Sequence, residues 1–231
     1  MDSVYKPETN KDKKSVFKIM GASNHSDVDR QLQDYYASHP STIDDLILRL
    51  KGLHCNVLEP AAGEGHLALS LESFGHNVIE ADILKRSTRT IVHNFLEDDP
   101  SKLNLPEKFD IVTNPPYKYA IQFVKKSLEI LPQDRYLAML LKLTFLEGDG
   151  RLKLFKKDPP KNVHVYSRRI ACAMNGDFST MGSSSVAYCW FIWQKGFQGE
   201  TSIGWIDNDR FSRTHPVFEL VEQDRKKLNG R

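Results

Sequence analysis

The stretch that decides the fold runs from Asn56 to His66 and has the sequence NVLEPAAGEGH. Residues 56–59 are typical of a short strand, Gly63 and Gly65 of a turn, and the apolar positions from Leu67 to Phe74 of a helix. Strand, glycine turn and helix in this order predict the first βα unit of a Rossmann-like domain, with space for a ligand against the glycines. Because glycine occurs in many turns, a nucleotide-like cofactor and a plain turn both stay open.

A second strand is predicted from Asn77 to Asp82, and it ends in an acid about twenty residues after the glycines. At that position a carboxylate can bind both hydroxyls of a ribose. Asp82 could instead cap the following turn, but its spacing from the glycine turn favours the ribose role.

Helix and strand patterns alternate along the rest of the chain, which predicts an α/β fold. A helix is expected over residues 43–50, with Ser41 or Thr42 as its cap and Lys51-Gly52 as its stop. An amphipathic helix is expected over residues 120–131. The remaining strands are expected over residues 90–96, 109–113, 136–143, 163–170, 185–193 and 202–206, followed by a charged tail. Residues 1–30 are polar and charge-mixed, which predicts a flexible N-terminal arm before one domain over residues 31–231.

The tetrapeptide Asn114-Pro115-Pro116-Tyr117 directly follows the predicted strand 109–113. A β-branched run that stops at two prolines predicts a buried strand ending in a rigid turn. Ligands bind at the carboxyl ends of strands in open α/β sheets, so these side chains are candidates for a functional site.

Composition places few limits on the partner. A chain of 231 residues, 40% hydrophobic and 27% charged, can bury one proper core, and its formal charge of +2 gives no global signal for a polyanion. The three cysteines have neither paired spacing nor an even count, so we expect neither a disulfide framework nor a metal site. Free cysteines are typical of proteins in a reducing cytoplasm, which is the expected location. Neither a signal peptide nor a membrane-spanning run is apparent.

Two later segments are candidates for substrate contact. Residues 151–169 hold seven basic side chains against one acid, which indicates a phosphate-contacting surface or merely a solvated face. The polar, glycine-containing loop over residues 175–184 is long enough to be functional, although the same composition suits a mobile loop.

The tetrapeptide and the glycine turn together resemble the class I S-adenosylmethionine-dependent amino-methyltransferases, and most closely the small N6-adenine DNA methyltransferases of phages and prophages. The resemblance covers roughly Tyr36 to Trp205. It implies a Rossmann-like fold with an antiparallel strand near the C-terminus, S-adenosyl-L-methionine as cofactor, and transfer of methyl to adenine N6 in flipped DNA. The cytoplasm of a bacterial or phage-infected cell is the implied location, with no membrane partner and an open oligomeric state.

The resemblance also implies roles for individual residues. The oxygen of Asn114 and the carbonyl of Pro115 would accept the two amine hydrogens, Pro116 would complete the rigid turn, and Tyr117 would stack on the base. Phe95 resembles a second aromatic wall, although an ordinary core position is about as plausible for it. The implied cofactor-binding residues are Tyr36, Pro40, Glu59, Pro60, Ala61, Gly63, Gly65, Asp82, Asn94 and Phe95.

The sequence departs from the family pattern at two places. Many relatives carry Asp where this chain has Asn94, and an amide cannot supply a carboxylate, which puts the role of Asn94 and the level of activity in doubt. The usual Thr-Pro of the N-terminal motif is replaced by the longer Ser38-His39-Pro40. No sizeable target-recognition domain follows the core, so loops or a partner would have to select the target.

Other acceptors share the tetrapeptide. Adenine or guanine methyltransferases acting on RNA carry it, and so do glutamine-N5 methyltransferases acting on proteins. The glutamine-directed enzymes generally have a helical N-terminal domain, which the polar residues before Asp34 cannot form. A non-catalytic binding protein on the same scaffold is the alternative from another functional class.

Overall fold

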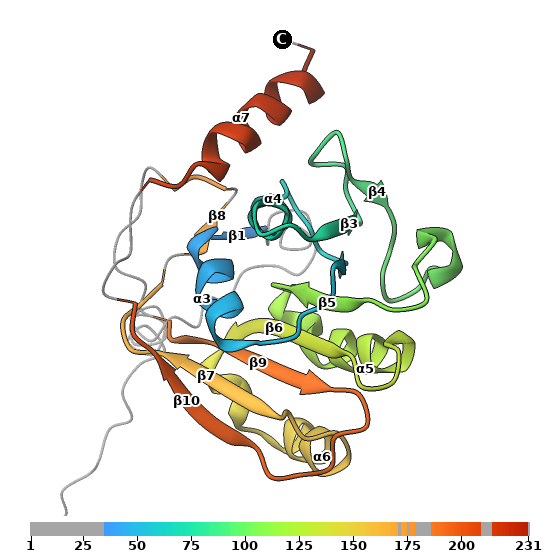
Figure 1. The fold of residues 1–231 in the computed structure, drawn as a ribbon, viewed down its shortest axis with the longest axis vertical. Helices are drawn as coiled ribbons and strands as arrows, with labels where there is room; N and C mark the ends of the chain where they lie inside the picture. The colour runs from blue at the N-terminus through green and yellow to red at the C-terminus, as the bar shows by residue number, and fades with distance from the viewer. Residues whose placement is uncertain (1–34, 171, 175, 179–185, 209–213, 231) are drawn as a thin grey trace, which may run out of the picture. The chain divides into compact units, whose positions relative to one another are not determined.

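A computed structural model describes residues 35–170, 172–174, 176–178, 186–208 and 214–230, and within them eight strands form the central sheet (Figure 1). The sheet has the order β10-β7-β9-β6-β5-β2-β3-β4. The strands are β2 (Asn56–Glu59), β3 (Asn77–Asp82), β4 (Ile91–Val92), β5 (Asp110–Thr113), β6 (Tyr136–Lys142), β7 (Asn162–Tyr166), β9 (Tyr188–Gln194) and β10 (Ser202–Ile206). The predicted arm over residues 1–30 and most of the loop 175–184 lie outside the described residues.

The direction of the strands confirms the predicted mixed sheet. Strands β4, β3, β2, β5 and β6 run parallel to one another, whereas β9 runs antiparallel to both of its neighbours, β6 and β7. Strand β10 pairs in parallel with β7. The carboxyl ends of β2, β3, β5 and β6 therefore meet at one edge of the sheet, which we call the carboxyl edge.

Helices cover both faces of the sheet because the strand residues are apolar on both sides. Along β2, Val57 contacts a core with α3 (Ser41–Arg49) and α4 (His66–Ser73), and Leu58 contacts the opposite core with α5 (Ala120–Ile130) and α6 (Asp149–Lys157). Ile111 and Val112 of β5 divide in the same way. The α/β fold predicted from alternating patterns is thus confirmed.

Two short strands at the carboxyl edge were not predicted. Strand β1 (Tyr36–Ser38) pairs antiparallel with β8 (Cys172–Met174) in a separate two-stranded sheet. Single-turn 3-10 helices lie at Pro100–Leu103, Tyr117–Tyr119 and Leu143–Leu146; the second begins four residues after the last residue of β5, and the third directly follows β6. The pairing of β1 with β8 brings together segments that are far apart in the sequence.

Several predicted boundaries were wrong. The cap of α3 is Pro40, without a side-chain cap, although the Thr42 hydroxyl donates to the His39 carbonyl. The strand expected over residues 90–96 is only Ile91–Val92, because Asn94 begins a hydrogen-bonded turn. The charged tail forms the helix α7 (Val217–Leu228), whose buried Val217 and Val221 supply an apolar side that the charge pattern concealed. No helix in the described residues is long and apolar enough to cross a membrane.

Candidate active site

Asn114 lies at the end of β5, and its side-chain amide is fixed by β1. The amide nitrogen donates to the carbonyl of Tyr36 over 3.0 Å and to the hydroxyl of Ser38 over 2.9 Å. The amide oxygen is buried and has no hydrogen-bond partner among the described residues. The assignment of nitrogen and oxygen follows from these two acceptors. A buried acceptor at the carboxyl edge is thus left available to a donor from outside the chain.

Tyr117 begins the short helix that follows the two prolines, and its ring is half-buried. The ring centroid lies 5.8 Å from that of Tyr188, and the hydroxyl reaches the thiol of Cys172 at 4.0 Å. The ammonium of Lys142, the last residue of β6, lies over the Tyr117 ring at 4.7 Å from its centroid. Pro115 is buried and Pro116 is exposed, so the turn anchors one side of the tetrapeptide and presents the other to solvent.

The glycine turn after β2 has the open backbone that its sequence predicts. Gly63 and Gly65 have φ angles of +56° and +84°, which side chains rarely adopt. The N–H of Gly63 donates to Asp82 over 2.8 Å, so the carboxylate at the end of β3 holds the turn. The other oxygen of Asp82 accepts from the N–H of Leu84. Each carboxylate oxygen retains further acceptor capacity, which a ribose hydroxyl could use.

The ring of Tyr35 lies directly against Gly63, in the place where a side chain at that position would project. Its hydroxyl accepts from the N–H of Glu64 over 3.0 Å, and the Arg86 guanidinium stacks over its ring at 4.7 Å. Gly63 is therefore required by the packing as well as by its backbone angle.

Three carboxylates lie at the ends of β2 and β3. Burial, with repulsion from Glu80 and Asp82, holds the pKa of Glu59 well above its usual range. One oxygen of Glu59 is buried without a hydrogen-bond partner among the described residues. Burial also raises the pKa of Glu80 to about 7, even though Glu80 forms an ion pair with Arg89. The unpartnered oxygen of Glu59, beside the glycine turn, fits the α-ammonium of a methionine moiety, whose positive charge would favour the ionised carboxylate that burial disfavours.

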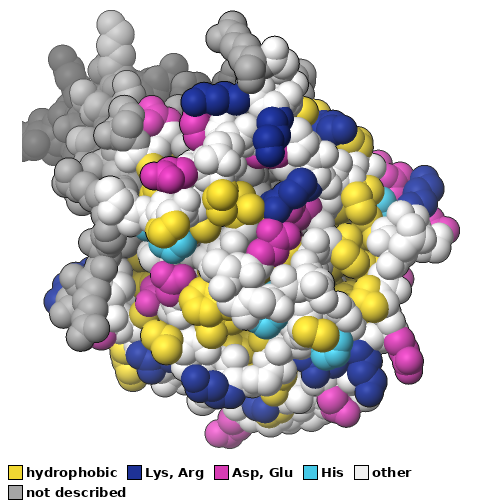
Figure 2. Space-filling view, turned by 45° about the horizontal axis from the view of Figure 1, so that its top comes forward, with side chains coloured by type: hydrophobic (Ala, Val, Ile, Leu, Met, Phe, Trp, Pro, Cys, Tyr) yellow, Lys and Arg dark blue, Asp and Glu magenta, His cyan; other side chains and the backbone are white. Residues whose placement is uncertain are grey.

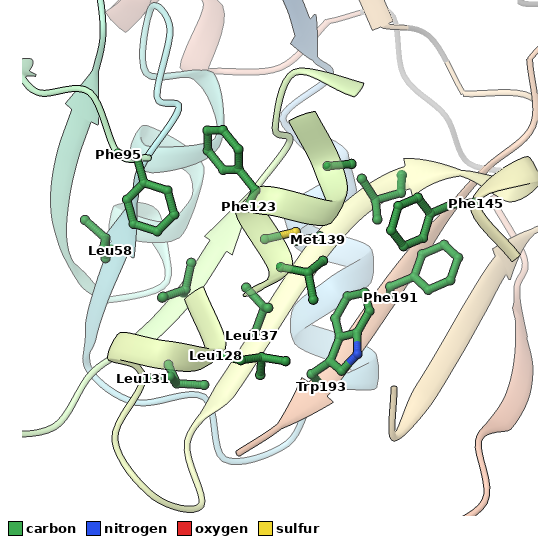
Figure 3. Close-up of a cluster of buried hydrophobic side chains, with 14 of the residues drawn as sticks. Leu58, Phe95, Phe123, Leu128, Leu131, Leu137, Met139, Phe145, Phe191 and Trp193 are labelled. Atoms are coloured by element: carbon green, nitrogen blue, oxygen red, sulfur yellow. The ribbon is translucent and has the colours of Figure 1, made fainter. Parts of the chain in front are cut away.

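Phe95 and Asn94, which were predicted as cofactor-binding residues, contact other parts of the chain in the structure. Phe95 is buried in the core, with its ring centroid 5.1 Å from that of Phe123 (Figure 3). Asn94 closes a local turn, since its side chain accepts from the N–H of Leu96 and donates to Glu97. These contacts assign both side chains to packing and to the turn, and any cofactor role for them stays a prediction.

The remaining predicted cofactor residues lie along β1 and after β2. Tyr36 is part of β1, and Pro40 is the buried cap of α3. Pro60 and Ala61 lead from β2 into the glycine turn. Since β1 is joined to Asn114, the structure brings the N-terminal motif beside the tetrapeptide.

A further contact to the glycine turn comes from α7. Arg225 donates to the Glu64 carboxylate over 2.8 and 3.0 Å, and Asp224 accepts from the N–H of Thr88 over 2.9 Å. The sequence offers no signal for these pairs, because a basic and acidic C-terminal helix predicts only a solvated surface.

Three basic side chains of the segment 151–169 have partners within the chain, and a phosphate-contacting surface there stays a prediction. Arg151 donates to the Glu147 carbonyl, Arg168 pairs with Asp207, and Lys161 donates to Gln194. On the face drawn in Figure 2, basic and acidic side chains are interspersed, in keeping with the small net charge.

A groove between α5 and α6 retains part of the expected positive charge. Its volume is about 830 Å³. Lys125, Lys153 and Lys157 line it and form no ion pair within the described part of the chain, and the acids Glu129 and Asp158 line it as well. Its apolar floor includes Leu128 and Leu154. We call this feature the α5–α6 groove. Two of its lysines, Lys153 and Lys157, belong to the predicted basic segment, and their contact with a phosphate stays a prediction.

Comparison with known proteins is informative at the level of the fold. No protein-family model and no curated protein matches this sequence. Among solved structures, a protein named as a class I S-adenosylmethionine-dependent methyltransferase from Listeria monocytogenes matches with a TM-score of 0.53 and 12% identity, over 91% of this chain and 75% of that chain.

Two further matches are named as parts of type I restriction enzymes. The modification subunit from Vibrio vulnificus matches with a TM-score of 0.55 and 12% identity, over 94% of this chain and 56% of that chain. The EcoKI M protein matches with a TM-score of 0.50 and 14% identity, over 72% of this chain and 45% of that chain. This chain therefore spans about half the length of these two proteins. The chain has the α/β fold of the class I S-adenosylmethionine-dependent methyltransferases, with β9 as the antiparallel strand near the C-terminus.

Proposed function

We propose that this protein transfers a methyl group from S-adenosyl-L-methionine to the exocyclic N6 amine of adenine in DNA. The observation that carries the proposal is the Asn114 side chain, whose nitrogen is held by β1 and whose oxygen is buried without a partner. An amide oxygen fixed in this way is suited to accept a hydrogen from an amine that enters the site.

An exocyclic adenine amine is a poor nucleophile because its lone pair is delocalised into the ring. The cofactor supplies a methyl group that is already activated on a sulfonium. The oxygen of Asn114 and the carbonyl of Pro115 would accept the two amine hydrogens and so aim the nitrogen lone pair at the methyl carbon. In the transfer, the amine nitrogen would take the methyl carbon, the electron pair of the broken carbon–sulfur bond would stay on sulfur, and the surplus proton of the methylated amine would pass to solvent water.

Tyr117 would hold the base by stacking, a contact that is worth about 1–3 kcal/mol in other base-binding sites. A base inside a duplex cannot reach the end of β5, so the adenine must be extruded or come from a single strand. The half-buried ring of Tyr117 beside the exposed Pro116 supports this role.

The cofactor would lie along the ends of β2 and β3. The unpartnered oxygen of Glu59 would accept from the methionine ammonium, Gly63 and Gly65 would allow close backbone approach, and Asp82 would bind the ribose. The names of the two structural matches from type I restriction enzymes support DNA rather than RNA or protein as the acceptor.

The test is a methyl-transfer assay with labelled cofactor on duplex DNA, single-stranded DNA, RNA and protein extract. We expect label on DNA adenine, and we expect Asn114→Ala to lower the rate at least about 100-fold while the calorimetric affinity for the cofactor is unchanged. The exposed Asn77→Ala is the matched control and should keep full activity. Cofactor binding without label in any acceptor would instead indicate a non-catalytic binding protein.

A further inference from the structure

Lys142 places a positive charge beside the tetrapeptide, with no ion-pair partner among the residues that the structure describes. Strands β5 and β6 are parallel neighbours, and Thr113 of β5 pairs with Met139 of β6. Pro116 and Lys142 each follow their member of this pair by three residues, so they lie at the same level of the carboxyl edge. Its ammonium lies over the Tyr117 ring at 4.7 Å from the centroid. Within the described residues Lys142 forms no ion pair.

Three neutral side chains of the described residues, those of Tyr117, Tyr188 and Cys172, lie next to this ammonium. Tyr188 of β9 is the residue that pairs with Lys142 of β6, and the thiol of Cys172 lies beside the rings of Tyr117 and Tyr188. Burial raises the pKa of Cys172 to about 11 and raises the pKa of Tyr188 as well, so neither side chain supplies an anion at neutral pH. The Tyr117 ring attracts the cation through its π face but leaves the charge uncancelled.

A half-buried lysine that has no counter-charge among the described residues can receive an anion that arrives with the substrate. The three classes of acceptor, which are DNA, RNA and protein glutamine, differ in whether they bring an anion to the site. A base in DNA or RNA carries a phosphodiester on each side, whereas a glutamine side chain brings no anion to the site. The long stem of lysine lets the ammonium leave the ring when a base stacks there and follow the phosphate.

We infer that Lys142 binds a backbone phosphate of the nucleotide whose base stacks on Tyr117, and so selects a nucleic-acid acceptor over a protein side chain. The inference rests on the proposed function and adds to it the group that recognises the acceptor class. Lys142 is in this view a specificity residue, while Asn114 and Tyr117 contact the base.

The experiment compares two versions of a nucleic-acid strand that the wild-type protein methylates. One has natural phosphates, and the other has neutral methylphosphonates on both sides of the target adenine. Lys142→Met keeps the stem and removes the charge, and Lys142→Arg keeps a charge. We expect Lys142→Met to lower kcat/KM about 10- to 100-fold on the natural strand, with unchanged cofactor affinity and melting temperature. Lys142→Arg should retain most of the wild-type activity.

The decisive readout is the combination of the variant with the neutral strand. If Lys142 contacts the phosphate, the kcat/KM of the wild-type protein falls on the neutral strand by the same factor that Lys142→Met loses on the natural strand. The kcat/KM of Lys142→Met on the neutral strand then falls no further. Equal losses for Lys142→Met on both strands would mean that the lysine only supports the Tyr117 ring, and the inference would be wrong while the proposed function stood. Absence of label on any nucleic acid with the wild-type protein would overturn both.

Discussion

The side-chain nitrogen of Asn114 donates to the hydroxyl of Ser38 over 2.9 Å, across 76 residues of sequence. This bond and the one to the Tyr36 carbonyl leave the Asn114 oxygen as the free end of the amide. The short strand β1 therefore orients the group that we propose for the amine, although β1 itself does not touch the reacting atoms in this scheme.

Removing the Ser38 hydroxyl should loosen Asn114 without removing it. We expect Ser38→Ala to lower kcat about 5-fold, because one neutral hydrogen bond is worth about 1 kcal/mol, and to leave cofactor affinity unchanged. Ser73→Ala, on the exposed side of α4, is the control. Steady-state kinetics and calorimetry measure both quantities. A Ser38→Ala enzyme with wild-type kcat would show that the Tyr36 carbonyl is sufficient to orient the amide.

A methyl group at Gly63 should cost more than its backbone angle alone predicts. Gly63→Ala puts a Cβ into the ring of Tyr35, whereas the control Gly75→Ala is also at a positive φ, +85° against +56° for Gly63, and has open space around it. We expect the free energy of unfolding to fall by about 1 kcal/mol for Gly75→Ala and by roughly 1–3 kcal/mol more for Gly63→Ala. Chemical denaturation measures the difference.

Tyr35→Ala combined with Gly63→Ala isolates the contact between these two side chains. In the Tyr35→Ala background, we expect Gly63→Ala to lower the free energy of unfolding by no more than Gly75→Ala does. An undiminished cost in the Tyr35→Ala background would place the strain in the backbone of the turn rather than against the ring.

Glu80 should make stability depend on pH. Burial raises its pKa from the ordinary 4.5 to about 7 in the folded chain. The folded state therefore holds the proton more tightly, so the contribution of Glu80 is full below about pH 4.5 and is lost as the pH rises to about 7. We expect the unfolding free energy of wild type relative to Glu80→Gln to fall by up to about 3 kcal/mol across this range.

Thermal melts of wild type and Glu80→Gln between pH 4 and 8 check this expectation, since subtracting the two curves removes the titration of other groups. Glu72→Gln is the matched control, because Glu72 also pairs with Arg89 but is far more exposed than Glu80. A difference curve that is flat with pH would mean that the Arg89 guanidinium fully offsets the burial of Glu80.

The α5–α6 groove should contribute to DNA affinity if its lysines meet phosphates. We expect the double charge reversal Lys153→Glu and Lys157→Glu to weaken binding and to reduce the slope of log affinity against log salt by about 2. Reversal of the exposed Lys51 and Lys85 conserves the change in net charge and serves as the control. Equal slopes for both double variants would show only a general charge effect, with no contact in the groove.

Local sequence determined the order of the elements and the positions of the two motifs. Val57 and Leu58 precede a glycine turn, and the β-branched run 109–113 is followed by Asn114 and two prolines. The periodicity of these runs predicts the strands, and the backbone limits of glycine and proline predict the turns at their carboxyl ends. These patterns act within a few residues, which is why β2, β3 and β10 were predicted with the bounds that the structure has.

The tertiary structure alone decided what surrounds those motifs. The pairing of β1 with β8, the bond from Asn114 to Ser38, the Lys142 ammonium over Tyr117 and the tie from Arg225 to Glu64 all join residues that are distant in sequence. The same holds for Phe95, for which the sequence left a cofactor wall and a core position open and which packs on Phe123 in the structure. Such contacts depend on how the chain packs as a whole, because side-chain partners are set by burial and by competition for hydrogen bonds rather than by local propensity.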